Sequence, residues 1–409
     1  MPGVDLLEPM VQPYAWGSRT AIARLQGRPA PTPQPEAELW MGAHPSAPSG
    51  VDRGGAHTTL DAVIAADPVD ELGAECAARF GGRLPFLLKV LAADKALSIQ
   101  VHPSREQAEA GFRAENERGL PPGDKARNYV DDWPKPELLC ALTPFEVLAG
   151  MRTAADAARL LGALGVAELA PVVAGLGSAA GEREALAPEA LTTALGQVLT
   201  WPAADRPALI ASVVAACGRL AAEGGPDAAA CRAVVRLDAE HPGDLGIVAS
   251  LLLRHGELQP GQAVFLPANG LHSYLHGTGI EVLANSDNVV RAGLTGKHID
   301  VPELLKLTDP AVAVPVIEPR ALGGGVSVYD TPAPEFRLYR AEIPAAEVAL
   351  PGDGPRIALC TDGTVALRSA TGGLLKAGRG ESCFLSAADG PVTASGPAAI
   401  FLASSGLSR

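Results

Sequence analysis

A chain of 409 residues, 47% of them hydrophobic, is long enough for two or three packed units. Its net charge of −13 argues against a nucleic acid or an anionic membrane as partner, because both require a basic surface. No apolar run reaches the roughly 20 residues that span a bilayer, and the first residues, MPGVDLLEPMVQPYAWG, lack the pattern of a signal peptide. We therefore expect a cytoplasmic protein with no membrane and no nucleic acid as partner.

Residues 1–150 consist of short apolar runs separated by Pro, Gly, Asn and Asp. Three of these runs predict strands because they are brief and partly alternating: Leu84–Ala92, Ala96–Val101 and Leu138–Leu142. The polar stretch Glu106–Asn116 between them predicts a short surface helix.

Between about 153 and 255 the chain becomes rich in Ala and Leu at helical spacing. Thr153, with Asp156 three residues later, marks the start of the first helix. No catalytic cluster is visible in this region, so we interpret it as a packed helical insertion. The predicted helices are Ala154–Leu164, Pro188–Leu199, Arg206–Glu223, Asp227–Glu240 and Leu245–Arg254.

From Gly256 the strand pattern returns and continues to the last residue. The segment GQAVFLPA, which begins at Gly261, is echoed by GESCFLSA from Gly380. Two copies of a strand-and-turn unit predict two related β-barrels. No histidine follows the second copy, so we expect a metal only in the first barrel.

Four residues in three separate segments form a candidate metal site. Gln100 and His102 end a predicted strand two residues apart, so both side chains point to one face. His272 follows the turn Pro267–Gly270, and the run from Gly261 resembles the second motif of the cupin proteins. Glu137 enters a buried strand, where a carboxylate needs a partner or a cation.

One amide oxygen, two imidazoles and one carboxylate form a four-ligand site of nitrogen and oxygen donors. With no sulfur ligand, this set suits Zn²⁺ with room for water or substrate, and Mn²⁺, Fe²⁺ and Co²⁺ remain chemically possible. We predict one zinc per chain.

Five segments together resemble the type I mannose-6-phosphate isomerases, a family of the cupin superfamily. They cover the first 150 residues and the region 256–310: QPYAWGSRTAIARL, AELWMGAHPSAPS, LPFLLKVLAADKALSIQVHP, NYVDDWPKPELLCAL and LPANGLHSYLHGTGIEVLANSDNVVRAGLTGKHIDVPELL. The resemblance implies zinc ligands at Gln100, His102, Glu137 and His272. It departs at Pro134, where many members have a histidine proposed as an acid or base, and a proline transfers no proton.

The resemblance also implies a mainly β fold of two cupin (jelly-roll) barrels with a helical insertion, and a monomer or weak homodimer. We expect the catalytic barrel to be formed by residues 1–150 and 256–320, the insertion by 151–255 and a barrel without metal ligands by 321–409. The implied reaction interconverts mannose 6-phosphate and fructose 6-phosphate, a small-molecule sugar phosphate pair, through a cis-enediol.

The phosphate requires cations that override the negative net charge of the chain. Arg291 and Lys297 follow the metal strand and are our first choice. Ser98 precedes Gln100 and is a further substrate contact. Lys89 lies inside an apolar strand, where a lysine normally has a partner or a role, so we assign it to the pocket.

Proton transfer between C1 and C2 requires a base within hydrogen-bond reach. Glu281, Asp287 and a water held by the metal are alternatives that the residues leave open. Glu281 lies in an apolar strand, so burial raises its pKa unless it pairs with Lys89 or Arg291. Lys135, or Arg291 instead, could stabilise the enediolate.

Three aromatic or imidazole side chains are further candidates for the pocket. Trp16 and His44 are expected to line it, and Tyr274 shares the face of His272 if the strand is regular, which places it near the sugar.

Two other functions compete with the isomerase. Oxidases and dioxygenases of the cupin class generally carry HxH with a Glu and a further His, whereas Gln100 replaces the first histidine here. A sugar-binding regulator without turnover is expected to have lost ligands or base candidates, and this chain keeps both.

Overall fold

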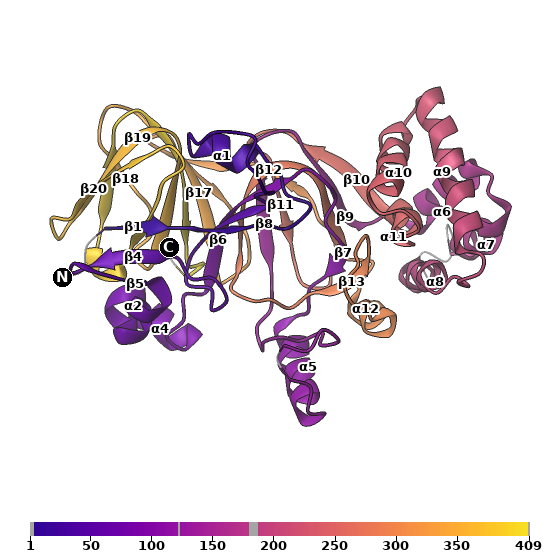
Figure 1. The fold of residues 1–409 in the computed structure, drawn as a ribbon, viewed down its shortest axis with the longest axis horizontal. Coiled ribbons are helices and arrows are strands. Elements are labelled where there is room, and N and C mark those ends of the chain that lie inside the picture. Colours follow the sequence, from indigo (N-terminus) through magenta and orange to yellow (C-terminus); the bar gives the residue numbers. More distant parts are fainter. Residues whose placement is uncertain (1–3, 122, 180–186, 408–409) are drawn as a thin grey trace.

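The computed structural model describes residues 4–121, 123–179 and 187–407. Along the longest axis of the molecule, one β-sheet region carries most of the C-terminal residues, a second lies in the centre, and a helical lobe follows (Figure 1). None of the helices in the described ranges is long and apolar enough to cross a membrane.

The first sheet lies in the centre of the molecule. Its longest path runs β14-β11-β8-β12-β6-β3-β2, and β7, β9, β10 and β13 attach to this path through β12 and its neighbours. All pairings are antiparallel. Its strands are β2 (Met10–Gln12), β3 (Glu38–Met41), β6 (Phe86–Ala93), β7 (Ile99–Val101), β8 (Glu137–Ala141), β9 (Phe145–Met151), β10 (Leu253–Leu258), β11 (Ala263–Leu266), β12 (His272–Ala284), β13 (Val290–Gly293) and β14 (Val316–Ile317).

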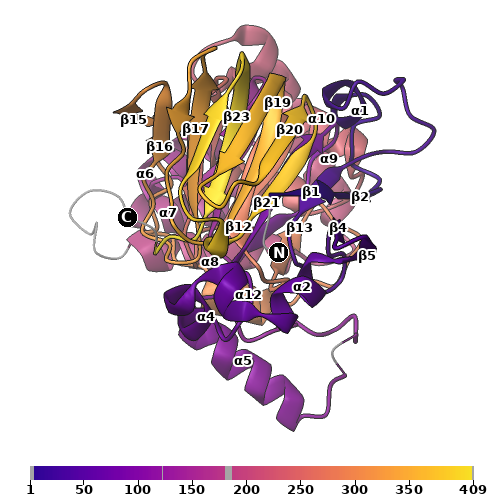
Figure 2. The ribbon, with the colours of Figure 1, turned by 90° about the vertical axis from the view of Figure 1, so that its left-hand side faces the viewer.

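The second sheet combines the two ends of the chain. Its path runs β15-β16-β17-β23-β19-β21-β1-β4-β5, and Figure 2 shows it face on. Strand β1 joins it through Leu6, which lies opposite Cys383. Its strands are β1 (Asp5–Glu8), β4 (Gly50–Arg53), β5 (Ala56–Thr59), β15 (Arg320–Gly323), β16 (Val326–Tyr329), β17 (Arg337–Ile343), β18 (Val348–Ala349), β19 (Arg356–Ser369), β20 (Leu374–Gly378), β21 (Ser382–Leu385), β22 (Val392–Ser395) and β23 (Ala398–Ser404).

The prediction of a mainly β protein with helices is confirmed by these two antiparallel sheets. The helices are α1 (Ala21–Leu25), α2 (Leu60–Ala66), α3 (Pro68–Leu72), α4 (Ala74–Phe80), α5 (Arg105–Glu117), α6 (Ala154–Leu164), α7 (Ala170–Ser178), α8 (Ala187–Leu199), α9 (Arg206–Glu223), α10 (Ala228–Glu240), α11 (Gly246–Ala249) and α12 (Val301–Leu307), with the 3-10 turns η1 (Ala167–Leu169), η3 (Ser250–Leu252) and η4 (Ala387–Asp389).

The helices α6 to α11 lie between two paired strands of the first sheet. Strand β9 enters the helical region and β10 leaves it, and Met151 lies opposite Leu253. The predicted helix Leu245–Arg254 is wrong in its second half. The α-helix ends at Ala249, and the backbone of Leu253 pairs with β9 instead of continuing a helix.

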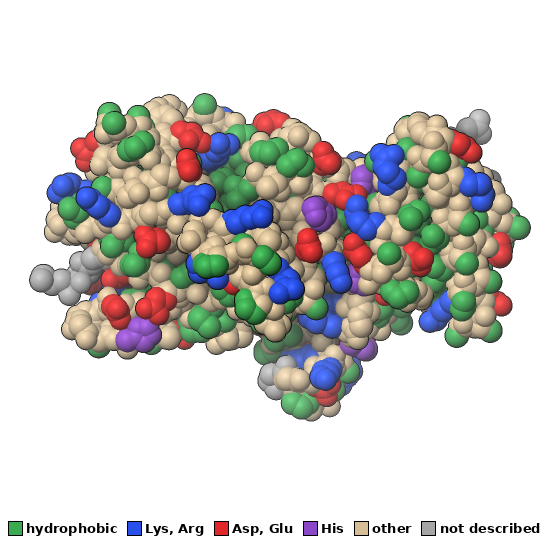
Figure 3. Space-filling model, turned by 45° about the horizontal axis from the view of Figure 1, so that its top comes forward, with side chains coloured by type: hydrophobic (Ala, Val, Ile, Leu, Met, Phe, Trp, Pro, Cys, Tyr) green, Lys and Arg blue, Asp and Glu red, His purple; other side chains and the backbone are tan. Residues whose placement is uncertain are grey.

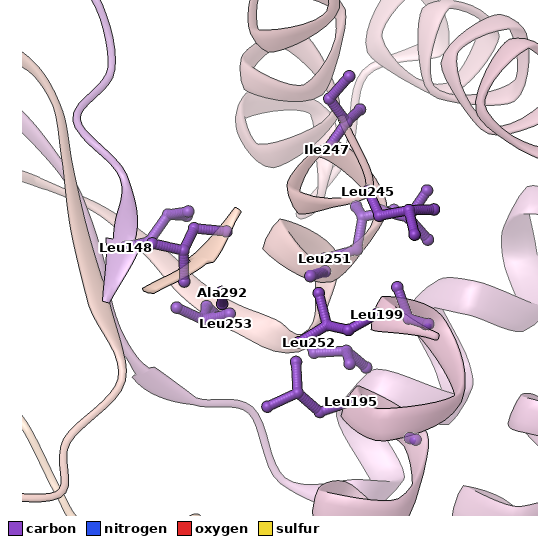
Figure 4. Packing of buried hydrophobic residues seen from close by; sticks show 14 of the residues in the cluster. Leu148, Leu195, Leu199, Leu245, Ile247, Leu251, Leu252, Leu253 and Ala292 are labelled. Atoms are coloured by element: carbon purple, nitrogen blue, oxygen red, sulfur yellow. The ribbon is translucent and has the colours of Figure 1, made fainter. Parts of the chain in front are cut away.

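The helical lobe shares one apolar core with the first sheet. Leu148 on β9 and Ala292 on β13 pack in the same cluster as Leu195, Leu199 and the segment Leu251–253, and Figure 4 shows these side chains converging. Ile99 and Val101, on either side of Gln100, belong to this cluster too. The helices therefore form part of the support of β7.

Successive side chains of a strand point to opposite faces, so alternate residues of β6 and β8 face different sides of the first sheet. On β6, Phe86, Leu88, Val90 and Ala92 pack in the cluster that joins the two sheets, while Lys89 between them points to the other face. On β8, Leu138 and Cys140 face that same cluster, so Glu137 faces the side of Lys89. The interior face of the first sheet is thus the one that carries charged residues.

On the face shown in Figure 3, Lys and Arg side chains are interspersed with Asp, Glu and neutral residues. The expected absence of a nucleic-acid partner stays a prediction.

Candidate active site

A cavity of about 560 Å³ opens between the interior face of the first sheet and the end of α10. Seven residues predicted from the sequence line it: Trp16, Lys89, Ser98, Lys135, Asp287, Arg291 and Lys297. Gln100 lines it as well. Tyr274 and Glu281 are not in its lining, because both are buried behind the wall.

The short strand β7 sets the layout of the site. It pairs with β12 on one side, so that His272 lies opposite Gln100, and with β13 on the other, so that Arg291 lies opposite the same residue. A predicted metal ligand and a predicted phosphate contact therefore flank Gln100 on neighbouring strands.

Three of the four predicted ligands meet behind Gln100. His102, Glu137 and His272 each offer a ligand atom, and these atoms lie within 4.8 Å of one another. The Nε2 atoms of His102 and His272 lie 3.2 Å and 3.6 Å from the two Glu137 oxygens. The three side chains are at most 2% exposed, so water does not satisfy them.

The other ring nitrogen of each histidine is already engaged. Nδ1 of His102 lies 2.7 Å from the carbonyl of Asn288, and Nδ1 of His272 lies 3.0 Å from that of Gly270. A carbonyl only accepts, so both Nδ1 atoms carry the proton and both Nε2 atoms present a lone pair. A hydrogen bond from the other ring nitrogen to a carbonyl is usual for metal-binding histidines.

The electrostatics of the cluster favour neutral imidazoles. Burial lowers the pKa of His102, and burial with the nearby His102 lowers the pKa of His272 to about 4. Burial acts to raise the pKa of Glu137, but the neighbouring His102 and Lys135 outweigh it and hold that pKa well below the usual range. Neutral imidazoles and an ionised carboxylate are the forms that ligate a metal.

The residues fit a metal ion on a further observation. Nε2 of His102 and Oε2 of Glu137 are buried, and neither atom has a hydrogen-bond partner within the described part of the chain. Buried polar atoms left in this way are costly unless a cation or water satisfies them. The donor set contains nitrogen and oxygen only, which suits zinc.

Gln100 has its amide nitrogen 3.4 Å from Nε2 of His272, while its oxygen accepts from Ser98 Oγ at 3.0 Å. Ligation through oxygen requires the amide to turn over, which exchanges two atoms of almost equal size. The hydroxyl of Ser98 can then accept from the amide nitrogen, so the change leaves no lost contact.

Two lysines line the cavity, and they contact different carboxylates. Lys135 has Nζ 3.2 Å from Glu137 Oε1, which places it beside the predicted metal ligands. Lys89 lies opposite Glu281 in the sheet register, and its Nζ is 3.3 Å from Glu281 and 3.6 Å from Glu38. Of the two partners proposed for Glu281, the structure thus places Lys89, not Arg291, beside it.

The Lys89 group contains two carboxylates and one ammonium. Burial opposes the charge on Lys89, but Glu38 and Glu281 outweigh it and raise the pKa of the lysine. Burial raises the pKa of Glu281, with Lys89 acting against it. Glu38 was missed by the sequence reasoning, although it carries the same signal as Lys89, a charge inside an apolar run, AELWM.

Asp287 differs from Glu281 in that it faces the cavity. Its Oδ2 lies 3.4 Å from Nε2 of His44. Nδ1 of His44 accepts from the backbone N–H of Ser46 at 3.3 Å, so the proton is on Nε2 and points to Asp287. Burial acts to raise the pKa of Asp287, but the His44 hydrogen bond together with the nearby Lys135 and Lys89 outweighs burial and lowers the pKa.

Arg291 and Lys297 form the cationic part of the wall. Arg291 is half-buried and Lys297 is exposed, both line the cavity, and neither makes an ion pair with a residue in the described ranges. Burial lowers the pKa of Arg291, and burial together with Arg291 lowers that of Lys297. Lys297 also lies over the ring of Tyr14, 5.7 Å from its centre. Two adjacent unpaired cations suit an anionic group.

Tyr274 lies deeper than expected from its predicted sugar contact. It is 2% exposed, and its ring meets Phe145 edge on. Burial and the carboxylates of Glu281 and Glu137 raise its pKa well above the usual value. Tyr14 and Trp40 line the cavity in its place, and sequence reasoning did not single them out.

The fold and the donor set define this chain as a β protein with a buried metal-type site beside a cationic cavity. A family described as phosphomannose isomerase type I, catalytic domain, matches residues 5–154. The mannose-6-phosphate isomerases of Salmonella typhimurium and Escherichia coli are each 37% identical, with 94% of this chain and 95% of the relative covered.

A solved structure, a zinc-bound mannose 6-phosphate isomerase, superposes with a TM-score of 0.87 at 35% identity, covering 98% of this chain and 99% of that one. The chain belongs to the type I phosphomannose isomerase family.

Proposed function

We propose that this chain interconverts mannose 6-phosphate and fructose 6-phosphate with one zinc held by Gln100, His102, Glu137 and His272. The observation that carries the proposal is a buried trio of nitrogen and oxygen donors directly behind a cavity whose wall holds the unpaired cations Arg291 and Lys297. A sugar phosphate matches this arrangement, because its neutral end can lie near the donor trio and its anionic end near the two cations.

Zinc is the metal that the donor set and a zinc-bound relative of the same fold support. When bound, it supplies Lewis-acid polarisation of sugar oxygens. The residues that hold it also exclude water, since the three ligands are at most 2% exposed.

Arg291 and Lys297 bind the phosphate in this proposal. Arg291 offers a planar group that makes two parallel hydrogen bonds to a phosphate, and Lys297 adds a point charge. Because both lie just beyond β7, a phosphate bound there directs the sugar towards Gln100 and Lys135.

Asp287 is our choice for the proton transfer between C2 and C1. It is the one carboxylate of the two predicted candidates that lines the cavity, and its lowered pKa keeps it ionised at neutral pH. It takes the proton from one carbon and returns it to the other, so the proton balance closes on the carboxylate. Lys135 faces the developing oxyanion, and Glu281 acts by holding Lys89.

We also propose that each sheet is a cupin-type barrel and that the units are residues 1–150 with 256–320, 151–255 and 321–409. The echo of Gly261 in Gly380 and the pairing of β9 with β10 around the helices support this division. One refinement is needed: β1, β4 and β5 pair within the second sheet. The cytoplasmic location and the monomer or weak homodimer stay predictions.

The test is conversion of mannose 6-phosphate to fructose 6-phosphate before chelation, after EDTA, and after zinc is returned. Activity that disappears and then returns supports the proposal. Absence of conversion by a chain with zinc demonstrably bound would remove this substrate. Glucose 6-phosphate and unphosphorylated mannose, assayed in parallel, measure how much of the specificity the phosphate provides.

A further inference from the structure

The loop of residues 94–98 joins β6 to β7, the strand that carries Gln100, and lines the cavity. Its two ends are held by neighbours in the same wall. The N–H groups of Asp94 and Lys95 donate to the carbonyl of Trp16 at 3.0 and 3.1 Å, and the N–H of Leu97 donates to that of Tyr274 at 2.8 Å.

The middle of this loop is held by the helical lobe. Ala96 is 2% exposed, so water does not satisfy its backbone. Its N–H donates to Glu240 Oε2 at 2.9 Å, and its carbonyl lies 3.3 Å from Nε2 of His241, which suits donation from that nitrogen. Both backbone groups of one residue are thus bound by consecutive side chains at the end of α10.

The end of α10 is itself anchored to the first sheet. Arg236, one turn before Glu240, lies 3.6 Å from its carboxylate and donates to Glu146 of β9 at 2.5 Å. Glu146 in turn lies 2.6 Å from Nε2 of His255 on β10. Cys231, Val234 and Leu237 of α10 also belong to the apolar core that the helical lobe shares with the first sheet. The two side chains therefore extend from a fixed support.

A carboxylate in the wall of a cavity for an anion needs an explanation. Glu240 lines the cavity with Arg291 and Lys297, and its charge opposes the approach of a phosphate. The contacts of Glu240 point to Ala96 and Arg236 rather than to a ligand. Its presence is therefore accounted for by the loop that it holds.

We propose that Glu240 and His241 are positioning residues of the active site, and that the helical lobe thereby fixes the loop leading into β7. The loop carries Ser98, whose hydroxyl contacts the metal ligand Gln100. Release of Ala96 loosens Ser98 and the wall that receives substrate. The kinetic consequence rests on the proposed isomerase function, whereas the effect on the loop does not.

Amide hydrogen exchange of the peptides that cover 94–98, measured with steady-state kinetics, tests the proposal. The Glu240→Ala variant removes the acceptor, Glu240→Gln keeps an acceptor oxygen without the charge, and Asp238→Ala is the matched control. Asp238 is on the same helix, and its side chain makes no hydrogen bond or ion pair with any residue that the structure describes.

We expect Glu240→Ala to speed exchange at the loop about tenfold and to raise KM about tenfold with a smaller change in kcat, the effect of one lost hydrogen bond. Glu240→Gln restores most of both values, and Asp238→Ala changes neither. His241→Ala gives the same pattern, and His241→Gln, which keeps a donor, reverses it.

Loop exchange that stays unchanged in folded Glu240→Ala overturns the proposal. So does an equal effect of Glu240→Gln, because the charge and not the hydrogen bond is then responsible. If Glu240→Ala does not fold, the two His241 variants decide in the same way. If every variant and the parent lack isomerase activity while loop exchange follows the prediction, the proposed function fails and the positioning role stands.

Discussion

The two sheets of this protein share strand pairing and a sequence echo but differ in what their interiors contain. Gly261 and Gly380 both adopt a positive φ before an inward-facing strand, β11 and β21. The interior of the second sheet is mostly apolar, with Cys360, Leu367, Leu385 and Leu402 in one cluster, although the fully buried Arg356 lies on the same face of β19 as Cys360. The interior of the first sheet holds Lys89, Glu137, Glu281 and both histidines.

This difference indicates that the first sheet carries the chemistry and that the second sheet contributes mainly to stability. Buried charges destabilise a fold unless they are paired or bind a cation, and in the first sheet the pairs of Lys89 and Lys135 with nearby carboxylates offset only part of this cost. The second sheet has filled the corresponding space with hydrophobic side chains, which gain stability from burial. A residue of one interior should therefore affect activity and a residue of the other should affect stability.

The largest effect is expected for Glu137→Gln in the first interior. The amide keeps the shape but lacks the charge that balances the metal, so activity should fall on the order of 10³-fold or more. The unfolding temperature of the metal-free protein should change by only a few degrees, because a buried carboxylate is removed at the same time. Initial rates and calorimetry of the chelated protein measure the two values. An active variant would contradict the role of Glu137.

Leu367→Ala makes the opposite change in the second interior. Leu367 is fully buried in the apolar cluster, so truncation leaves a cavity and should lower the free energy of unfolding by about 2–5 kcal/mol. At a temperature where the variant stays folded, its kcat/KM and zinc content should match the parent. Denaturant unfolding and rate measurements together check this. A loss of zinc at full folding would mean that the two interiors are coupled.

Arg291→Ala probes the cationic wall rather than the metal. Loss of a charge-assisted phosphate contact should lower kcat/KM about 10- to 100-fold, mainly through KM, with zinc content unchanged. Arg254→Ala on the exposed face of β10 serves as control. Inhibition by inorganic phosphate should weaken in the first variant alone. Equal inhibition of both variants would place the phosphate elsewhere.

Glu146→Gln gives the smallest effect and depends on pH. Burial acts to raise the pKa of Glu146, but His255 and Arg236 outweigh it and lower the pKa below the ordinary 4.5. The carboxylate therefore stabilises the fold above the unfolded-state pKa, and this is lost as pH falls through the folded-state pKa. The variant should be less stable by about 1 kcal/mol at pH 7.

The same Glu146→Gln deficit should disappear at strongly acidic pH, where the parent carboxylate is protonated too. Unfolding midpoints of both proteins across pH 3–7 measure it. A deficit independent of pH would show that packing, not the charge of Glu146, anchors α10.

Local signals were sufficient for much of the secondary structure. Thr153 caps α6 as predicted, its side chain accepting from Asp156, and the helix has the predicted bounds. The short helices α2, α3 and α4 were missed because Asp67–Pro68 and Gly73 divide the segment into pieces too brief to show helical periodicity. The entry of β1 into the second sheet was not predictable, since pairing with residue 383 leaves no local mark.

The candidate metal ligands stand out in the sequence because residues unusual in strands occupy strand positions, as with Glu137 and Gln100. The partner of Glu281 was left open between Lys89 and Arg291, and only the register of β12 against β6 decides it. The hold of Glu240 on Ala96 joins residues 144 positions apart. Contacts of this kind depend on the folded arrangement and have no sequence pattern.

The most direct test of the account is the zinc content of the parent chain and of His272→Ala, determined by elemental analysis after dialysis and compared with Leu367→Ala. We predict one zinc per chain in the parent and in Leu367→Ala, and almost none in His272→Ala. A full equivalent of zinc retained by folded His272→Ala would contradict the assignment of the site to the interior of the first sheet.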